Sequence, residues 1–94
     1  MVAVLGILTF AFYSPRLQSE LGAQMNIQMQ LGARIRENRS RLGWSQETFA
    51  DMCGLNRSHM GEIERGRANV TLATLVIIAQ KLETSAAELL RDLR

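Results

Sequence analysis

Between residues 31 and 90 the sequence is divided into short segments by signals that stop one helix and start the next. Gly43, Gly54 and Gly66 each follow a run of apolar residues with helical spacing, as glycines at helix C-termini do. Four residues with capping side chains stand where the next helices should begin: Ser45, Asn56, Thr71 and Ser85. A chain interrupted this often forms short helices, and we expect five of them in a compact bundle.

Composition supports an all-α fold. Aromatic residues make up 5% of the chain and there is a single proline, while leucine, isoleucine, alanine and arginine recur. Each expected helix has one apolar side, and Ser85 with Glu88 forms a capping box for the last helix. The side chains expected to point inward in the first three helices are Leu31, Ile35, Leu42, Phe49, Ala50, Cys53, Met60 and Ile63.

The expected fourth helix, from Leu72 to Leu82, is apolar on at least two sides. One side belongs in the core, so the other needs a cover. A two-fold dimer interface is one solution, and the residues expected in it are Val76, Ile77, Leu89 and Leu93. The alternative is that the apolar N-terminal tail folds back over this surface and leaves the protein a monomer.

That tail, Met1 to Tyr13, carries no charge. It is shorter than the roughly 20 apolar residues of a membrane-spanning helix, and it lacks the basic start and the small-residue cleavage site of a signal peptide. We therefore expect no membrane role. Residues 1–28 are interpreted as an N-terminal extension, either disordered or folded onto the domain, and residues 29–94 as the domain. Translation starting at Met25 or Met29 is a further alternative.

Several classes of function find no support in the sequence. Cys53 is the only cysteine and His59 the only histidine, so no pair has metal-ligand spacing and no internal disulfide can form. The chain has no nucleophile motif, phosphate loop or core large enough for a deep pocket. We expect a cytoplasmic protein that is not an enzyme and has no metal, cofactor or small-molecule ligand. Net charge is +2, yet ten of the eleven basic residues are arginine, which suits contacts with phosphate and guanine.

The stretch from Gln46 to Arg65 has the spacing of a helix-turn-helix, because two short helices meet there with almost no connecting chain. Ala50 lets the helices cross closely, and Gly54 can adopt the positive φ of the turn. These demands are steric, and many unrelated helical hairpins satisfy them. The pattern alone therefore does not decide the function.

A longer series of motifs indicates a specific family. In order along the chain these are Ile35-Arg36-Glu37, Arg39, Gly43-Trp44-Ser45-Gln46-Glu47, Gly54-Leu55-Asn56-Arg57-Ser58 and Ile63-Glu64-Arg65-Gly66-Arg67. With them the chain resembles the Cro and repressor-type helix-turn-helix family, which implies a five-helix, lambda-repressor-like DNA-binding domain. The run Asn69-Val70-Thr71-Leu72 is most similar to the subgroup of restriction-modification controller proteins. His59 and Met60 depart from that subgroup's pattern, as does the apolar tail.

The resemblance implies a transcriptional regulator that binds double-stranded DNA, as a homodimer on a palindromic operator, with the helix around residues 56–65 in the major groove. Arg57 would bind guanine, and Glu62 would accept from cytosine or orient Arg57. The residues implied to contact DNA bases are Arg57, Ser58, Gly61 and Glu62. Those implied to contact the sugar–phosphate backbone of the DNA are Gln46, Asn56, His59, Arg65 and Arg67. Arg39 and Glu64 would form a structural ion pair. The alternative function is an antitoxin or bridging factor that uses the same fold to bind a protein.

Overall fold

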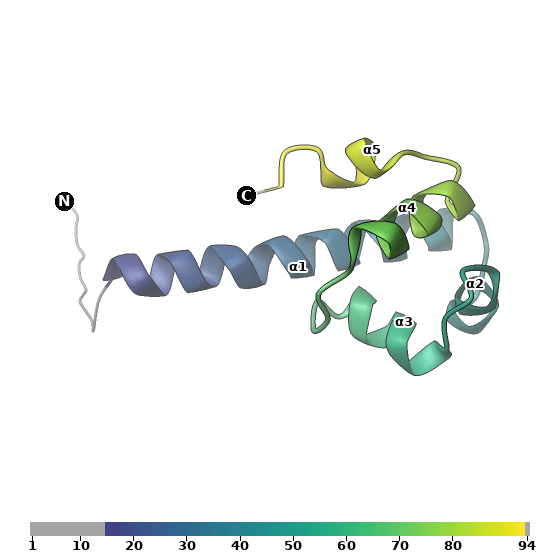
Figure 1. Cartoon of the computed structure of the whole chain (residues 1–94), viewed down its shortest axis with the longest axis horizontal. Coiled ribbons are helices and arrows are strands. Elements are labelled where there is room, and N and C mark those ends of the chain that lie inside the picture. The colour runs from purple at the N-terminus through teal and green to yellow at the C-terminus, as the bar shows by residue number, and fades with distance from the viewer. Residues whose placement is uncertain (1–14, 94) are drawn as a thin grey trace.

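The computed structural model describes residues 15–93, with side chains from Ile27 onward. This part of the chain contains no strand and folds into five helices, which confirms the all-α prediction: α1 (Pro15–Arg41), α2 (Gln46–Met52), α3 (Arg57–Glu64), α4 (Leu72–Lys81) and α5 (Ala86–Leu90). Figure 1 shows α1 as a long rod, with the four short helices gathered along its C-terminal half. α2 and α3 follow each other on one side of α1 and form the helix-turn-helix.

The first helix is longer than expected. The sequence placed its start near Leu31, whereas α1 begins at Pro15 and has 27 residues. Proline is accommodated in the first turn of a helix, and the leucine, glutamine, alanine and methionine residues that follow it are good helix formers. None of the described helices combines the length and apolar character that crossing a membrane requires. The predictions about Met1 to Tyr13 lie outside the described residues.

All four predicted N-caps form. In each, the side-chain oxygen of the cap accepts a hydrogen bond from the backbone N–H three residues later, at 2.7–3.1 Å: Ser45 to Thr48, Asn56 to His59, Thr71 to Thr74 and Ser85 to Glu88. The capping box is only half formed, because the Glu88 carboxylate pairs with Arg91 at 2.6 Å. Gly54 has a φ of +73°, the left-handed conformation expected for the turn between α2 and α3.

The core lies between α1 and the short helices, and most of the residues expected to be buried are found in it. Leu42 is only half-buried at its edge. The ring of Trp44 stacks on that of Phe49, with 5.8 Å between the centroids. The buried apolar side chains are Leu31, Ile35, Phe49, Ala50, Cys53, Met60, Ile63, Leu75, Ile78, Ala79, Leu82 and Leu89.

The predicted dimer surface is wrong at Leu89. This side chain is 2% exposed and packs in the core, because α5 turns it toward the bundle. Leu93 is half-buried and packs against the same core. Val76 and Ile77, in contrast, are each 40% exposed on the outer side of α4. Only these two of the four predicted residues are therefore largely accessible to another molecule.

Candidate nucleic-acid interface

The first turn of α3 is the most accessible part of the helix-turn-helix. Arg57, Ser58 and His59 are all exposed, and the Asn56 cap fixes the direction in which the helix starts. None of the ion pairs among residues 27–93 includes Arg57. Its guanidinium can therefore turn toward a ligand without breaking a salt bridge.

A single carboxylate joins α3 to the two helices before it. Arg39 on α1 donates to Glu64 twice, from Nε to Oε2 at 2.7 Å and from Nη2 to Oε1 at 3.1 Å. Gln46 on α2 donates from Nε2 to the same Oε1 at 3.0 Å. The Glu64 side chain is 3% exposed and that of Arg39 is 12% exposed, so the pair is largely removed from water. Its position fixes the orientation of α3 relative to α1 and α2.

This network changes the interpretation of Gln46. Gln46 was expected to contact the DNA backbone, but in the structure its side-chain amide nitrogen donates a hydrogen bond to Glu64. A phosphate contact by the side chain would have to share or replace that hydrogen bond. The backbone N–H groups at the start of α2 do not have this constraint. The contact itself stays a prediction.

The second half of α3 also differs from the expectation. Gly61 was expected to contact the bases, but it is buried, because the Arg65 side chain lies over it. Glu62 pairs with Arg65 at 2.5 Å and not with Arg57. The hydrogen bond from Arg65 lowers the pKa of the Glu62 carboxyl. In this arrangement Arg65 covers part of the surface that was expected to face the bases.

Two further predicted backbone contacts lie at the ends of α3. Asn56 is exposed, but its side-chain oxygen is engaged by the N–H of His59 at 2.7 Å. Its amide NH2 group remains available to a phosphate oxygen. Arg67 is exposed just beyond α3, where its backbone N–H donates to the Glu62 carbonyl at 2.9 Å. Both residues therefore border the accessible face of the helix.

Sequence reasoning missed two residues that position the helices. Gly32 is buried where α1 crosses the last turn of α3, and no side chain would fit between the two backbones. Arg34 donates from Nη1 to the Leu89 carbonyl at 3.0 Å and so ties α1 to α5. The only available signal for the first was an isolated glycine inside a helical pattern, which often marks a close packing contact. Nothing in the sequence distinguishes Arg34 from its neighbouring arginines.

The comparison with known families decides the identity of this arrangement. A model described as a helix-turn-helix domain matches residues 30–93, about two thirds of the chain. The chain belongs to the helix-turn-helix family. The match begins in the middle of α1 and covers all of α2 to α5. The N-terminal half of α1 therefore lies outside the matched domain.

Relatives of this helix-turn-helix protein include controllers of restriction-modification systems. It is 42% identical to the control protein C.SmaI of Serratia marcescens over 66 residues, which are 70% of this chain and 79% of that protein. The restriction-modification controller protein C.AhdI from Aeromonas hydrophila, whose crystal structure is known, is 43% identical in sequence to this chain. The alignment has a TM-score of 0.63 and covers 65% of this chain and 92% of that chain.

A hypothetical transcription factor from Neisseria, whose crystal structure is known, is 34% identical in sequence to this chain. It matches with a TM-score of 0.66, over 71% of this chain and 77% of that chain. These findings confirm the predicted resemblance to the controller subgroup. Together with the family match they make the chain a DNA-binding transcriptional regulator.

Proposed function

We propose that this helix-turn-helix protein binds a palindromic operator as a homodimer and reads it with α3 in the major groove. The observation that carries the proposal is the exposed first turn of α3, held in place by the contacts of Glu64 with Arg39 and Gln46. An arginine in that position can bind O6 and N7 of guanine through two hydrogen bonds. A recognition helix already oriented in the free protein favours such a specific contact.

The residues of α3 fall into two groups. Arg57 and Ser58 are accessible as they stand, and we assign them to the bases. Gly61 and Glu62 come within reach of the bases only when Arg65 moves from its place over Gly61. A DNA phosphate that attracts Arg65 would produce this movement. The proposed backbone contacts are Gln46, Asn56, His59, Arg65 and Arg67.

We place the dimer interface on the outer side of α4. Val76 and Ile77 are each 40% exposed there, Leu72 on the same helix is 73% exposed, and Leu90 of α5 is 40% exposed. Leu90 thus replaces the buried Leu89 of the original prediction. A two-fold axis through this surface would present two recognition helices to half-sites about one helical turn of DNA apart.

The relatives named as control proteins suggest the biological role. We propose that this chain acts in the cytoplasm, without catalysis, cofactor or small-molecule effector, and controls genes that include its own. Protein concentration and cooperative binding to DNA would then determine the level of transcription.

Selection of duplexes from a random DNA pool tests the specificity. The full chain at about 150 mM salt should enrich a palindrome, and Arg57→Ala should lose or relax the preference at one base pair of each half-site, by about 1–3 kcal/mol. Arg91→Ala is the control, because this exposed arginine lies beyond α5. Failure of the folded protein to enrich any sequence would favour the alternative of an antitoxin or bridging factor that binds a protein.

Sedimentation equilibrium tests the dimer. The full chain should sediment as a dimer, and Val76→Glu should shift it to the monomer because a charge in the interface must be desolvated. Thr48→Glu, which adds the same charge at an exposed position on α2 and away from α4, is the control. A monomeric wild-type chain would contradict the homodimer without affecting the assignment of α3.

A further inference from the structure

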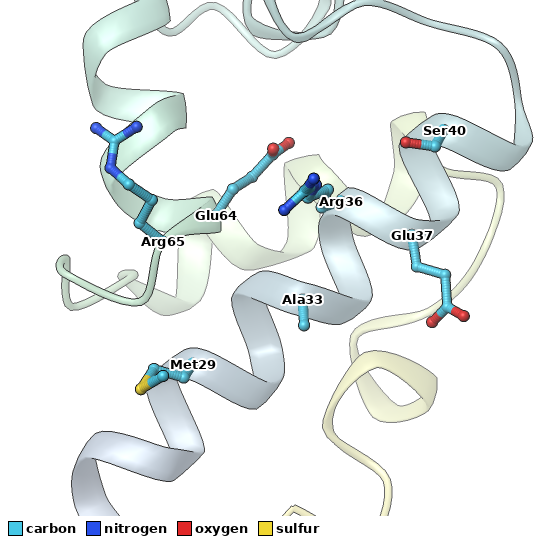
Figure 2. A pocket seen from close by; sticks show the side chains of 7 residues that line it. All are labelled: Met29, Ala33, Arg36, Glu37, Ser40, Glu64 and Arg65. Carbon is cyan, nitrogen blue, oxygen red and sulfur yellow. The ribbon is translucent and has the colours of Figure 1, made fainter.

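An open hollow of about 560 Å³ lies between α1 and the C-terminal end of α3, and no residue of α2 lines it. Figure 2 shows its walls. Exposed residues of α1 line one wall, and the last residue of α3 and the one after it line the other: Met29, Ala33, Arg36, Glu37 and Ser40 from α1, with Glu64 and Arg65. Arg36 extends from α1 toward α3, whereas the carboxylate of Glu37, which also lines the hollow, points away from α3 (Figure 2).

Two arginines and two glutamates line the hollow, and one of the glutamates, Glu64, is already neutralised by Arg39. The Glu64 carboxylate is nearly buried and its oxygens accept three hydrogen bonds from Arg39 and Gln46. None of the ion pairs among residues 27–93 includes Arg36. Arg65 is paired, but only with Glu62, and both of these side chains are about half exposed at 52% and 42%. The hollow therefore offers two arginine side chains that a stronger anion can recruit.

The position of Arg65 connects this hollow to the recognition surface. Its guanidinium covers Gly61 on the side of α3 assigned to the bases, and the same residue lines the hollow. A helix lying in the major groove is bordered by the sugar–phosphate strands that form the groove. Since Arg65 borders both the recognition face of α3 and the hollow, a DNA strand that flanks α3 on the α1 side would pass the hollow.

We propose that Arg36 on α1 binds a DNA phosphate in this hollow, together with Arg65. The proposal rests on the proposed function, since it places α3 in the major groove. The forked guanidinium of arginine matches the oxygens of a phosphodiester. Recruitment of Arg65 to this phosphate also uncovers Gly61 and releases Glu62. The contact gives α1 a role in fixing the tilt of α3 on the duplex, although α1 reads no base.

The salt dependence of binding tests the contact. Arg36→Gln removes one phosphate contact from each subunit of the dimer, so it should reduce the slope of log K against log salt concentration by about 1.8, or about 0.9 for each contact. Because a phosphate contact carries no sequence information, the variant should weaken binding to the operator and to random duplex by the same factor, roughly three- to tenfold for each contact near 150 mM salt. Arg36 is exposed, so the variant should keep the thermal midpoint of the wild-type chain.

Arg41→Gln is the matched control. Arg41 is also an exposed arginine of α1, but it hydrogen-bonds Asn38 and does not line the hollow. The control should keep both the affinity and the salt slope. An unchanged slope in Arg36→Gln, or an equal loss in Arg41→Gln, would overturn the proposal. The measurement on random duplex also decides the role of Arg36 if selection finds no operator, so failure of the proposed specificity is distinguished from failure of this contact.

Replacing single duplex phosphates with neutral methylphosphonates locates the partner. At one phosphate per half-site the wild-type chain should lose affinity while Arg36→Gln loses almost none, because the interaction is already absent. Losses that are additive at every phosphate would show that Arg36 contacts none of them.

Discussion

Gly32 lies directly against the last turn of α3, where a Cβ on residue 32 would stand 2.5 Å from the carbonyl oxygens of both Ile63 and Glu64. The two helices therefore cross backbone to backbone. This close approach also brings α1 near enough for Arg39 to reach Glu64, so the crossing and the ion pair depend on each other.

Gly32→Ala should lower the free energy of unfolding by about 1–3 kcal/mol, because backbone atoms have to separate to admit the methyl group. Urea denaturation measures the change. Gly61→Ala is the control. Its Cβ would meet the end of the Arg65 side chain at 3.2 Å, which can move aside. That variant should instead gain up to about 1 kcal/mol from its helix propensity. Equal effects at the two positions would contradict the crossing described above.

Glu64→Ala should destabilise the fold by about 3 kcal/mol, because it leaves the largely buried Arg39 guanidinium without its carboxylate. Glu88→Ala provides the comparison. Its partner Arg91 is at 2.6 Å, but the two side chains are 55% and 66% exposed, so we expect a loss below about 1 kcal/mol. Chemical denaturation of both variants at the same pH measures the two losses in unfolding free energy. Equal losses would show that Glu64 contributes no more than an exposed surface charge.

Glu83, which follows the C-cap Leu82 of α4, adopts a φ of 60°, a left-handed conformation that costs a residue with a Cβ about 1–2 kcal/mol. Glu83→Gly should raise the free energy of unfolding by about 0.5–1 kcal/mol, since part of the gain is offset by the greater freedom of glycine in the unfolded chain. Glu83→Ala keeps the Cβ and should show no such gain. Thermal denaturation compares the three proteins.

Burial raises the pKa of the Cys53 thiol above its ordinary value of 9.0, although the nearby Lys81 opposes the shift. Between the unfolded and the folded pKa the native state binds more protons than the unfolded chain. The contribution of the neutral thiol to stability is therefore complete below about pH 9 and is lost as the pH rises through the folded pKa. The difference in unfolding free energy between wild type and Cys53→Ala should shrink above pH 9, and a constant difference would contradict the shift.

The capping residues explain why so much of the fold could be predicted from the sequence. Ser45, Asn56 and Thr71 act through a backbone N–H only three residues away, so their role can be inferred locally. The same is true of the periodic apolar residues of the core. Resemblance to a family supplied the pairing of Arg39 with Glu64, which are 25 residues apart.

The errors arose where the outcome depends on packing between helices. Gly61 was assigned to the bases through the family resemblance and Leu89 to a dimer interface, but Arg65 covers the first and the bundle encloses the second. Gln46 was assigned to the DNA backbone, but its side-chain amide already donates a hydrogen bond to Glu64. The early start of α1 was missed because residues 1–28 were interpreted as an extension of the domain, although α1 begins at Pro15.

The three-way contact at Glu64 affects the thermodynamics of association. A recognition helix that is already ordered loses little conformational entropy on reaching DNA, so binding is not coupled to folding. The heat-capacity change measured by calorimetry should then correspond to the surface buried at the interface alone, without the additional negative contribution that ordering a segment produces.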